Sequence, residues 1–224
     1  MAKSTESSEP TESAESELST PFTIGIVLFD RAEELDWVGP FEVFTMAREV
    51  AYGKGRPAEL RVVLISHDGA VVEGAKGLRV EVDHSFSNAP AIDVLLIPGG
   101  IGTRDEMKNE VMLEFLREKA AECEWVTSVC TGSGVLERAG LTTGKRITTH
   151  WAYIPTLRET AGDATTVLEN VRYVRDGNLV TAAGVSAGID MALWLTGELF
   201  GVPHARLTQR GMEYDPAPPY TADV

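Results

Sequence analysis

Cysteine and histidine are scarce in this sequence, and their scarcity limits the chemistry that it can support. Among 224 residues there are two cysteines, Cys123 and Cys130, which are too few for a disulfide framework. The four histidines are scattered and form no HxxxH pair, and the cysteines form no CxxC pair. Because metal sites of the zinc type need several such ligands at short spacing, we expect no metal site.

Long apolar runs and clusters of basic residues are also missing. No run approaches the roughly 18 apolar residues of a membrane span, and the N-terminus lacks the apolar segment of a signal peptide. Lysine and arginine total 20 against 34 acidic residues, which gives a net charge of −14. Binding to nucleic acid needs a basic patch. We therefore expect a cytoplasmic protein with a small-molecule substrate, and neither a membrane nor a nucleic acid as partner.

Residues 1–20 differ in composition from the rest of the chain. They hold five glutamates, one lysine and six serines, and almost no large apolar side chain. Such a segment cannot bury enough surface to offset its ordering entropy, so we predict a disordered acidic tail that aids solubility or carries a phosphorylation site. No linker or repeat follows, and residues 21–224 are predicted to form a single domain.

Strand-like and helix-like patterns alternate from Phe22 onward, with short apolar runs for strands and longer amphipathic stretches for helices. The predicted strands cover residues 22–29, 60–66, 78–84, 93–97, 125–129 and 146–150, with a hairpin over 171–184. The predicted helices cover residues 40–51, 104–122, the stretch after Cys130, a segment from Tyr153, 186–201 and 204–212. This alternation predicts an α/β fold with a mostly parallel sheet, whose ligands bind at the carboxyl ends of the strands.

Cys130 lies where the strand 125–129 passes into a helix. Small residues, Ser128 and Gly132, stand two positions to either side, as in the G-x-S-x-G elbow that exposes a nucleophile on a sharp turn. The N-terminus of the following helix favours a thiolate and predicts a thiol pKa below the free value of about 8.5. The alternative is that Cys130 is a small buried hydrophobic residue, as we expect for Cys123.

Two further strand ends carry candidate functional groups. Gly99 and Gly100 follow the strand 93–97, where they either form a tight turn or point their amides into a cleft to stabilise an oxyanion. The third glycine of a dinucleotide turn is missing. Asp36 precedes a predicted helix and is suited to cap its N-terminus, but it could instead face the cleft as a general acid or base.

Five stretches of the sequence resemble, in order and spacing, the ThiJ/PfpI family of the glutamine amidotransferase-like superfamily. They read IPGG, VTSVCTGS, AGLTTGKRITTHWAY, VRDGNLVTAAGVSAGIDMAL and EYDPAPPY, and the resemblance covers residues 22–220. It implies a flavodoxin-like three-layer α/β sandwich with a cysteine nucleophile elbow, no cofactor and a homodimer. Ala182 and Ala183 depart from the family, whose relatives are richer in glycine there.

The same resemblance implies roles for individual residues. Cys130 matches the nucleophile and Asp36 its acidic partner. The backbone amides that match an oxyanion site are those of Thr131, Gly99 and Gly100. Thr131 also stands where the peptidase branch has a histidine, so the resemblance does not extend to proteolysis. The glyoxalase branch usually carries glutamate in place of Asp36, which counts against that activity.

His150 and the elbow sequence bear on the activity that the resemblance implies. His150 falls where relatives place a histidine near the site, and a partly buried, satisfied histidine is the alternative. The elbow is most similar to the isonitrile-hydrating branch, which implies a cysteine-dependent hydratase, a lyase that converts isocyanides to N-substituted formamides through a covalent thioimidate. The alternatives are a glyoxalase-like activity and a ligand or oxidant sensor. Sensor domains of helix-turn-helix regulators are also similar, but no basic module is present before Val224.

Overall fold

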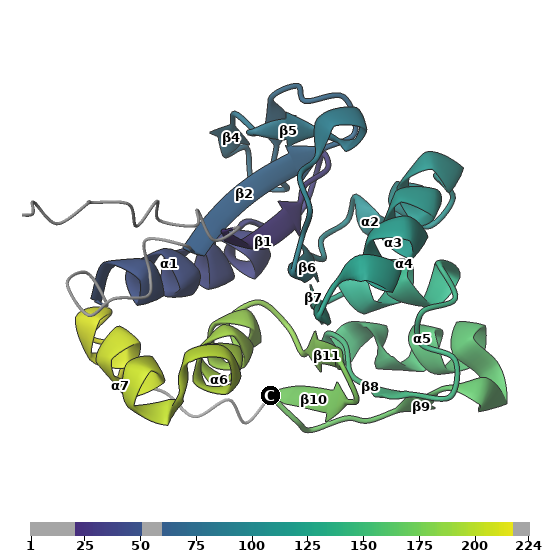
Figure 1. Cartoon of the computed structure of the whole chain (residues 1–224). Coiled ribbons are helices and arrows are strands. Elements are labelled where there is room, and N and C mark those ends of the chain that lie inside the picture. The colour runs from purple at the N-terminus through teal and green to yellow at the C-terminus, as the bar shows by residue number, and fades with distance from the viewer. Residues whose placement is uncertain (1–20, 51–59, 217–224) are drawn as a thin grey trace, which may run out of the picture.

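One seven-stranded sheet runs through the middle of the molecule (Figure 1). The computed structural model describes residues 21–50 and 60–216, so the tail predicted over 1–20 lies outside the described residues. The strand order is β10-β11-β7-β6-β1-β2-β5, and neighbours are parallel except for β10 and β11. The strands are β1 (Phe22–Val27), β2 (Leu60–Ser66), β5 (His84–Ser85), β6 (Val94–Ile97), β7 (Trp125–Val129), β10 (Tyr173–Asp176) and β11 (Leu179–Ala182).

The middle of the sheet is buried on both faces. Every residue of β6 and β7 is buried, which fits their nearly continuous apolar sequences. Ile24 of β1, Val94 of β6 and Trp125 of β7 lie opposite one another, so apolar side chains from three strands form a shared layer. Because these strands are parallel, the chain leaves all three at the same edge of the sheet, and this edge holds the site described below.

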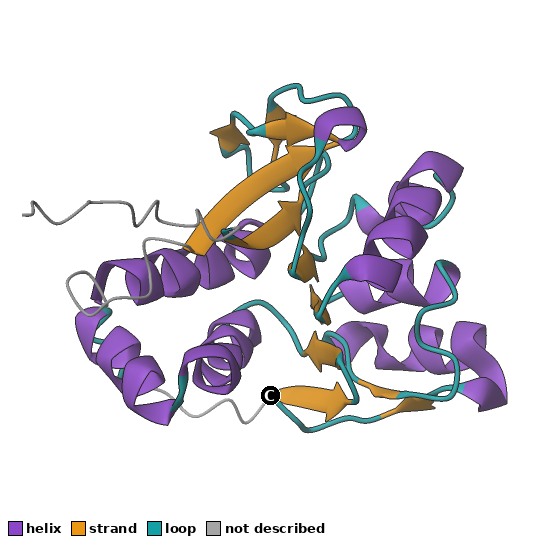
Figure 2. Cartoon of the chain, viewed as in Figure 1, coloured by secondary structure: helices purple, strands orange, loops and turns teal. Residues whose placement is uncertain are grey.

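Helices lie on both sides of the sheet (Figure 2). In Figure 1, α1, α6 and α7 pack against one another to the left of β6 and β7, whereas α2, α3, α4 and α5 lie to the right. The helices are α1 (Glu34–Val50), α2 (Thr103–Glu106), α3 (Glu110–Glu122), α4 (Gly132–Arg138), α5 (Ile154–Ala161), α6 (Ala187–Phe200) and α7 (Val202–Gly211). This arrangement confirms the predicted flavodoxin-like α/β sandwich.

Two helices differ from the sequence-based prediction. The helix expected over residues 104–122 is divided into α2 and α3, because Asn109 caps a new helix and its side chain accepts a hydrogen bond from the Met112 amide at 3.4 Å. The helix expected from Pro40 begins earlier, at Glu34, and the proline lies inside α1. A proline removes one backbone hydrogen bond, so a helix with a large buried face can tolerate it.

Short pairs of strands complete the chain. β3 (Val72–Glu73) and β4 (Arg79–Val80) form an antiparallel pair, and β8 (Arg146–Ile147) and β9 (Thr166–Val167) form a parallel one. The strand expected over residues 78–84 is therefore divided between β4 and the edge strand β5. The hairpin of β10 and β11 is confirmed, with Gly177 at its turn in the left-handed region, φ 65°.

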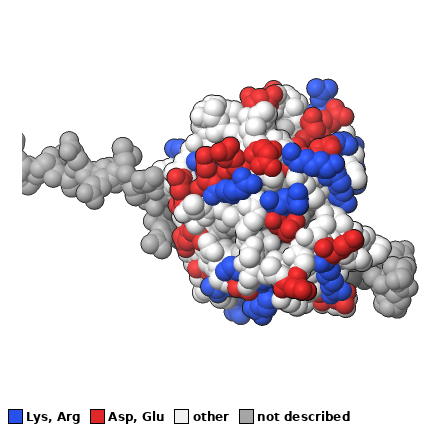
Figure 3. Space-filling model, turned by 90° about the vertical axis from the view of Figure 1, so that its right-hand side faces the viewer, with Lys and Arg blue, Asp and Glu red and all other residues white. Residues whose placement is uncertain are grey.

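Charged side chains of both signs are mixed on the face drawn in Figure 3. Among the ion pairs of the chain, Arg172 is joined to Asp190 at 2.6 Å and Arg175 to Glu198 at 3.2 Å. Screened pairs of this kind contribute little to stability. Over residues 21–50 and 60–216, no helix combines the length and apolar character that crossing a membrane requires.

Candidate active site

Cys130 occupies a sharp turn between β7 and α4. Its φ angle is +56°, in the left-handed region that non-glycine residues seldom adopt. Its backbone amide donates to the carbonyl oxygens of Ala182 (3.1 Å) and Ala183 (2.7 Å) after β11. Its carbonyl oxygen accepts from the hydroxyls of Ser133 (3.1 Å) and Thr149 (2.8 Å). Contacts from three parts of the chain therefore hold this residue in a conformation that costs free energy, as is common at functional sites.

Glycine at position 132 allows the turn to pack tightly against the end of β6. A Cβ atom on Gly132 would lie 2.3 Å from the carbonyl oxygen of Ile97 and 2.7 Å from that of Pro98. The small residue predicted to sit two positions after the nucleophile is therefore needed for close approach between two neighbouring strand ends.

Asp36 lies beside Cys130, although 94 positions separate them in the sequence. Its side chain is fully buried, and Oδ2 accepts a hydrogen bond from the Gly99 amide at 2.8 Å. Its other oxygen, Oδ1, is buried and has no hydrogen-bond partner of normal geometry among the described residues. The suggestion that Asp36 caps a helix is wrong, because α1 begins at Glu34 and Asp36 is already inside it.

Burial changes the protonation of Asp36. Loss of hydration is the main cause that raises the pKa of this carboxyl to about 7, and the nearby Glu33 carboxylate acts in the same direction. Hydrogen bonding from the Gly99 amide opposes the shift, as do the Cys130 thiol and the Val185 amide. At neutral pH the carboxyl is consequently able both to accept and to donate a proton.

The Cys130 thiol is also buried, and burial raises its pKa to about 12. The negative charge of Asp36 adds to the increase, whereas the backbone amides of Thr131 and Val185 oppose it. The prediction of a lowered thiol pKa is therefore wrong. The helix expected to stabilise a thiolate, α4, has only seven residues, and its dipole is outweighed by desolvation and by the adjacent carboxylate.

Gly99 and Gly100 form the tight turn that brings these groups together. A Cβ atom on Gly99 would lie 2.5 Å from the Thr131 nitrogen and 2.8 Å from both Asp36 Oδ2 and Cys130 Cβ. Gly100 has a φ of +113°, and its amide donates to Thr131 Oγ1 at 3.0 Å. In this structure the two glycine amides thus hold Asp36 and Thr131 in place, and neither points into open space.

His150 follows Thr149, whose hydroxyl donates to the Cys130 carbonyl. Its ring packs against Gly184, where a Cβ atom would come within 2.3 Å of the ring, and its Nδ1 accepts from the Ala152 amide at 3.3 Å. The side chain is half-buried, and burial lowers its pKa, so it is neutral at pH 7. Gly184 precedes Val185, whose φ of +48° is a second strained angle beside the site.

The sequence analysis missed two residues that contact the site. The hydroxyl of the fully buried Thr103 donates to the Gly100 carbonyl at 2.7 Å and to Thr131 Oγ1 at 3.1 Å. The Arg104 guanidinium donates from Nη1 to the Gly100 carbonyl and to Thr103 Oγ1, both at 3.0 Å. Their position directly after a glycine turn at the end of a buried strand is the signal that could have identified them.

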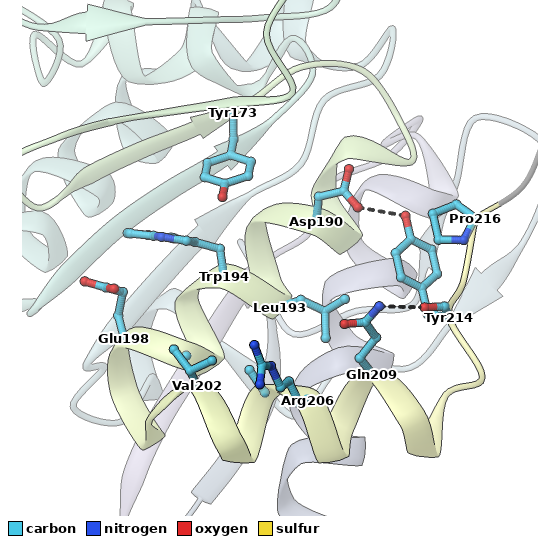
Figure 4. A pocket seen from close by; sticks show the side chains of 12 residues that line it. Tyr173, Asp190, Leu193, Trp194, Glu198, Val202, Arg206, Gln209, Tyr214 and Pro216 are labelled. Atoms are coloured by element: carbon cyan, nitrogen blue, oxygen red, sulfur yellow. Dashed lines mark hydrogen bonds between the residues drawn. The ribbon is translucent and has the colours of Figure 1, made fainter.

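A separate cavity of about 520 Å³ lies between α6, α7 and β10 (Figure 4). Trp194, Leu193 and Tyr173 form its apolar part. The Tyr214 hydroxyl donates to Asp190 at 2.8 Å at one end. None of the residues around Cys130 lines it. In the described parts of the chain, no group of three His, Cys, Asp or Glu side chains is arranged to bind a metal ion.

Comparisons with known proteins show which sequences this chain resembles. The chain is 44% identical to a protein named isonitrile hydratase from Pseudomonas putida, over 88% of this chain and 80% of that protein. It is 30% identical to the HTH-type transcriptional regulator GbdR of Pseudomonas aeruginosa, over 81% of this chain and 47% of the regulator.

Structural and family comparisons extend these similarities to the whole fold. A crystal structure of a ThiJ/PfpI family protein from Pseudomonas syringae superposes with a TM-score of 0.81 at 27% identity, covering 97% of this chain and 86% of that one. Residues 23–197 match the DJ-1/PfpI family. Since this match spans most of the sheet and both halves of the site, the chain belongs to the DJ-1/PfpI family.

Proposed function

We propose that this protein is a cysteine-dependent isonitrile hydratase, which converts isocyanides and water to N-substituted formamides. The observation that carries the proposal is the buried pair of Cys130 and Asp36, in which a carboxyl of pKa about 7 adjoins a thiol on an elbow. The 44% identity to the Pseudomonas putida isonitrile hydratase supports this substrate class. The pair supplies a nucleophile and a proton carrier, the two groups that the hydration needs.

The first step is proton transfer from the Cys130 thiol to Asp36. Burial is the main reason that the pKa of the thiol is high, and ionising it while Asp36 keeps its charge would in addition place two negative charges together. Transfer within the pair keeps a single negative charge throughout. The amides of Thr131 and Val185 then stabilise the thiolate, and its sulfur attacks the terminal carbon of the isocyanide.

In the second step Asp36 returns the proton to the substrate. Attack by sulfur leaves an electron pair on the former isocyanide carbon, and protonation of that carbon by Asp36 gives a thioimidate, R–N=CH–S–Cys130. The unpartnered Oδ1 of Asp36 is the oxygen available for this transfer, because Oδ2 is held by the Gly99 amide. A covalent intermediate of this kind divides one difficult addition into two easier ones.

In the third step Asp36 removes a proton from water as the water oxygen adds to the thioimidate carbon. The proton passes to the substrate nitrogen and gives the tetrahedral species R–NH–CH(OH)–S–Cys130. Collapse breaks the carbon–sulfur bond, the hydroxyl proton returns through Asp36 to the thiolate, and R–NH–CHO leaves. In this scheme Gly99 and Gly100 position Asp36 and Thr131, and the neutral His150 borders the substrate.

Turnover with a simple isonitrile tests the proposal. With cyclohexyl isocyanide we expect N-cyclohexylformamide at many equivalents per protein, and oxygen-18 from labelled water in its carbonyl group. Methylglyoxal and a peptide amide serve as comparison substrates. A stoichiometric reaction that stops after one equivalent would favour a ligand or oxidant sensor, and turnover of methylglyoxal alone would favour a glyoxalase.

We also propose that the protein is a cytoplasmic homodimer. Both cysteines are free, as expected in a reducing compartment. Near the site, Trp151 has 79% of its surface exposed and Ile101 has 53%, and a partner subunit would cover such apolar side chains. Sedimentation at micromolar concentration is expected to give twice the 24.2 kDa of one chain, and a monomer at that concentration would contradict the proposal.

A further inference from the structure

Arg104 places a fixed guanidinium group beside Thr131, the residue that follows Cys130. Its Nη1 donates to the Gly100 carbonyl and to Thr103 Oγ1 at 3.0 Å each, and lies 3.5 Å from Thr131 Oγ1. The guanidinium carbon lies 5.1 Å from the centre of the Tyr153 ring, close enough for a cation–π contact. The Nη1 edge and one face of the guanidinium group are thus held in place, although Arg104 is exposed to solvent.

The rest of the guanidinium group is available to a ligand. All three of its hydrogen bonds in the structure are made by Nη1, and over residues 21–50 and 60–216 no carboxylate lies within ion-pairing distance. Glu33, whose charge influences His150 from the same side, is paired with Lys76. His150 is itself neutral at pH 7. Arg104 is therefore a positive charge near Thr131 that no described carboxylate neutralises.

We infer that Arg104 selects isonitriles that carry a carboxylate on the group attached to nitrogen. This inference rests on the proposed function and names its substrate class. A guanidinium fork matches a carboxylate with two parallel hydrogen bonds, and Nη2 and Nε supply such a pair of donors. Because Nη1 and Tyr153 already hold the group, binding a carboxylate orders little additional side chain.

A matched pair of substrates tests this selection. Isocyanoacetate and its methyl ester differ by one negative charge, and the quantity to measure is the ratio of their kcat/KM values. In Arg104→Met, which keeps the length of the side chain and removes its charge, we expect that ratio to fall at least about tenfold through the KM of isocyanoacetate. Arg104→Lys keeps the positive charge but lacks the two parallel donors of a guanidinium group, so its ratio is expected to lie between those of the wild type and Arg104→Met.

Arg210→Met is the control, since it removes an exposed positive charge from α7, away from Cys130. Its ratio is expected to match that of the wild type within about twofold. If Arg104→Met lowers kcat for both substrates equally, the residue only holds the Gly100 turn and the inference is overturned. An unchanged ratio in Arg104→Met overturns it as well.

Binding of the reaction product separates this inference from the proposed function. N-formylglycine, the product expected from isocyanoacetate, keeps the carboxylate and needs no turnover to bind. By calorimetry we expect Arg104→Met to raise its Kd at least about tenfold, with no such change for N-formylglycine methyl ester. Failure to hydrate any isonitrile, together with weaker binding of N-formylglycine to Arg104→Met, would end the proposed function and leave Arg104 as a carboxylate-binding residue. Equal affinity of wild type and Arg104→Met for N-formylglycine would end the selectivity inference alone.

Discussion

The two cysteines are alike in most of the properties by which a reactive thiol is usually recognised. Cys130 has 6% of its surface exposed and Cys123 has 8%, and neither forms a disulfide. Burial raises the pKa of both thiols to about 12. Each also has a carboxylate nearby that adds to the shift, Asp36 for Cys130 and Asp93 for Cys123. Burial and thiol pKa therefore do not distinguish the nucleophile.

The difference lies in what surrounds each sulfur. Cys123 follows α3 in extended backbone, with φ −70°, and Asp93 Oδ2 there accepts a hydrogen bond from the Thr23 amide. Cys130 is held at φ +56° beside two amides that stabilise its anion, and beside a carboxyl of pKa about 7 with one oxygen unpartnered. On the proposed mechanism, the comparison teaches that a buried thiol needs an adjacent proton acceptor, rather than a low pKa of its own, to act as a nucleophile.

Exchanging each cysteine for alanine gives the largest expected difference. Cys130→Ala is expected to reduce isonitrile hydration to the uncatalysed background, because no other group can form the thioimidate. Cys123→Ala removes a similarly buried sulfur and is expected to keep at least about half of kcat, with some loss of thermal stability. Kinetics with circular dichroism to confirm folding are the measurement. Hydration by folded Cys130→Ala would end the mechanism.

Substitution of Asp36 is expected to have the next largest effect. Asp36→Asn retains an oxygen that can accept from the Gly99 amide but removes the transferable proton, so we expect kcat to fall on the order of 10²-fold or more. Asp93→Asn, made beside the other cysteine, is the matched control and is expected to leave kcat within about twofold. Full activity in Asp36→Asn would show that the carboxyl only fixes the turn.

The pH dependence of activity sharpens the comparison further. The folded pKa of Asp36 is raised to about 7, so below that pH the carboxyl is protonated and cannot take the thiol proton. We expect kcat/KM to rise with pH through about 7 and to be about tenfold below its plateau one unit lower. The residual activity of Asp36→Asn is expected to lack this rise. A wild-type profile that is flat from pH 5 to 8 would contradict the assignment of Asp36.

Thiol labelling gives the smallest expected effect. At pH 8 iodoacetamide is expected to modify Cys130 about tenfold faster than Cys123, because Asp36, a carboxyl of pKa about 7, can take the thiol proton as the sulfur is alkylated. Asp36→Asn removes this proton acceptor, so labelling of Cys130 is expected to slow together with turnover. Peptide mass spectrometry over time measures both rates. Faster labelling of Cys123 would refute the view that Asp36 activates the Cys130 thiol.

The alternation of apolar strands and amphipathic helices could be predicted because each pattern depends on residues only a few positions apart. The predicted helix boundaries are wrong where a side-chain cap or tertiary packing outweighs the helical periodicity of the sequence. Asn109 divides the stretch 104–122 because its side chain caps a backbone amide, an effect weaker than the helical periodicity around it. Pro40 suggested a helix start, yet packing of α1 against α6 and α7 holds the proline inside the helix.

The sequence by itself determined the α/β class and the small residues of the elbow, and its similarity to known motifs suggested Cys130 and Asp36 as candidate catalytic residues. Only the tertiary structure decided that Asp36 lies inside α1 with its carboxyl against Gly99, that the Cys130 pKa is raised, and that Thr103 and Arg104 contact Thr131. The physical reason is the distance along the sequence over which each effect acts. Helix and strand formation depend on near neighbours, whereas desolvation and charge interactions sum over groups that the parallel sheet brings together from distant parts of the chain.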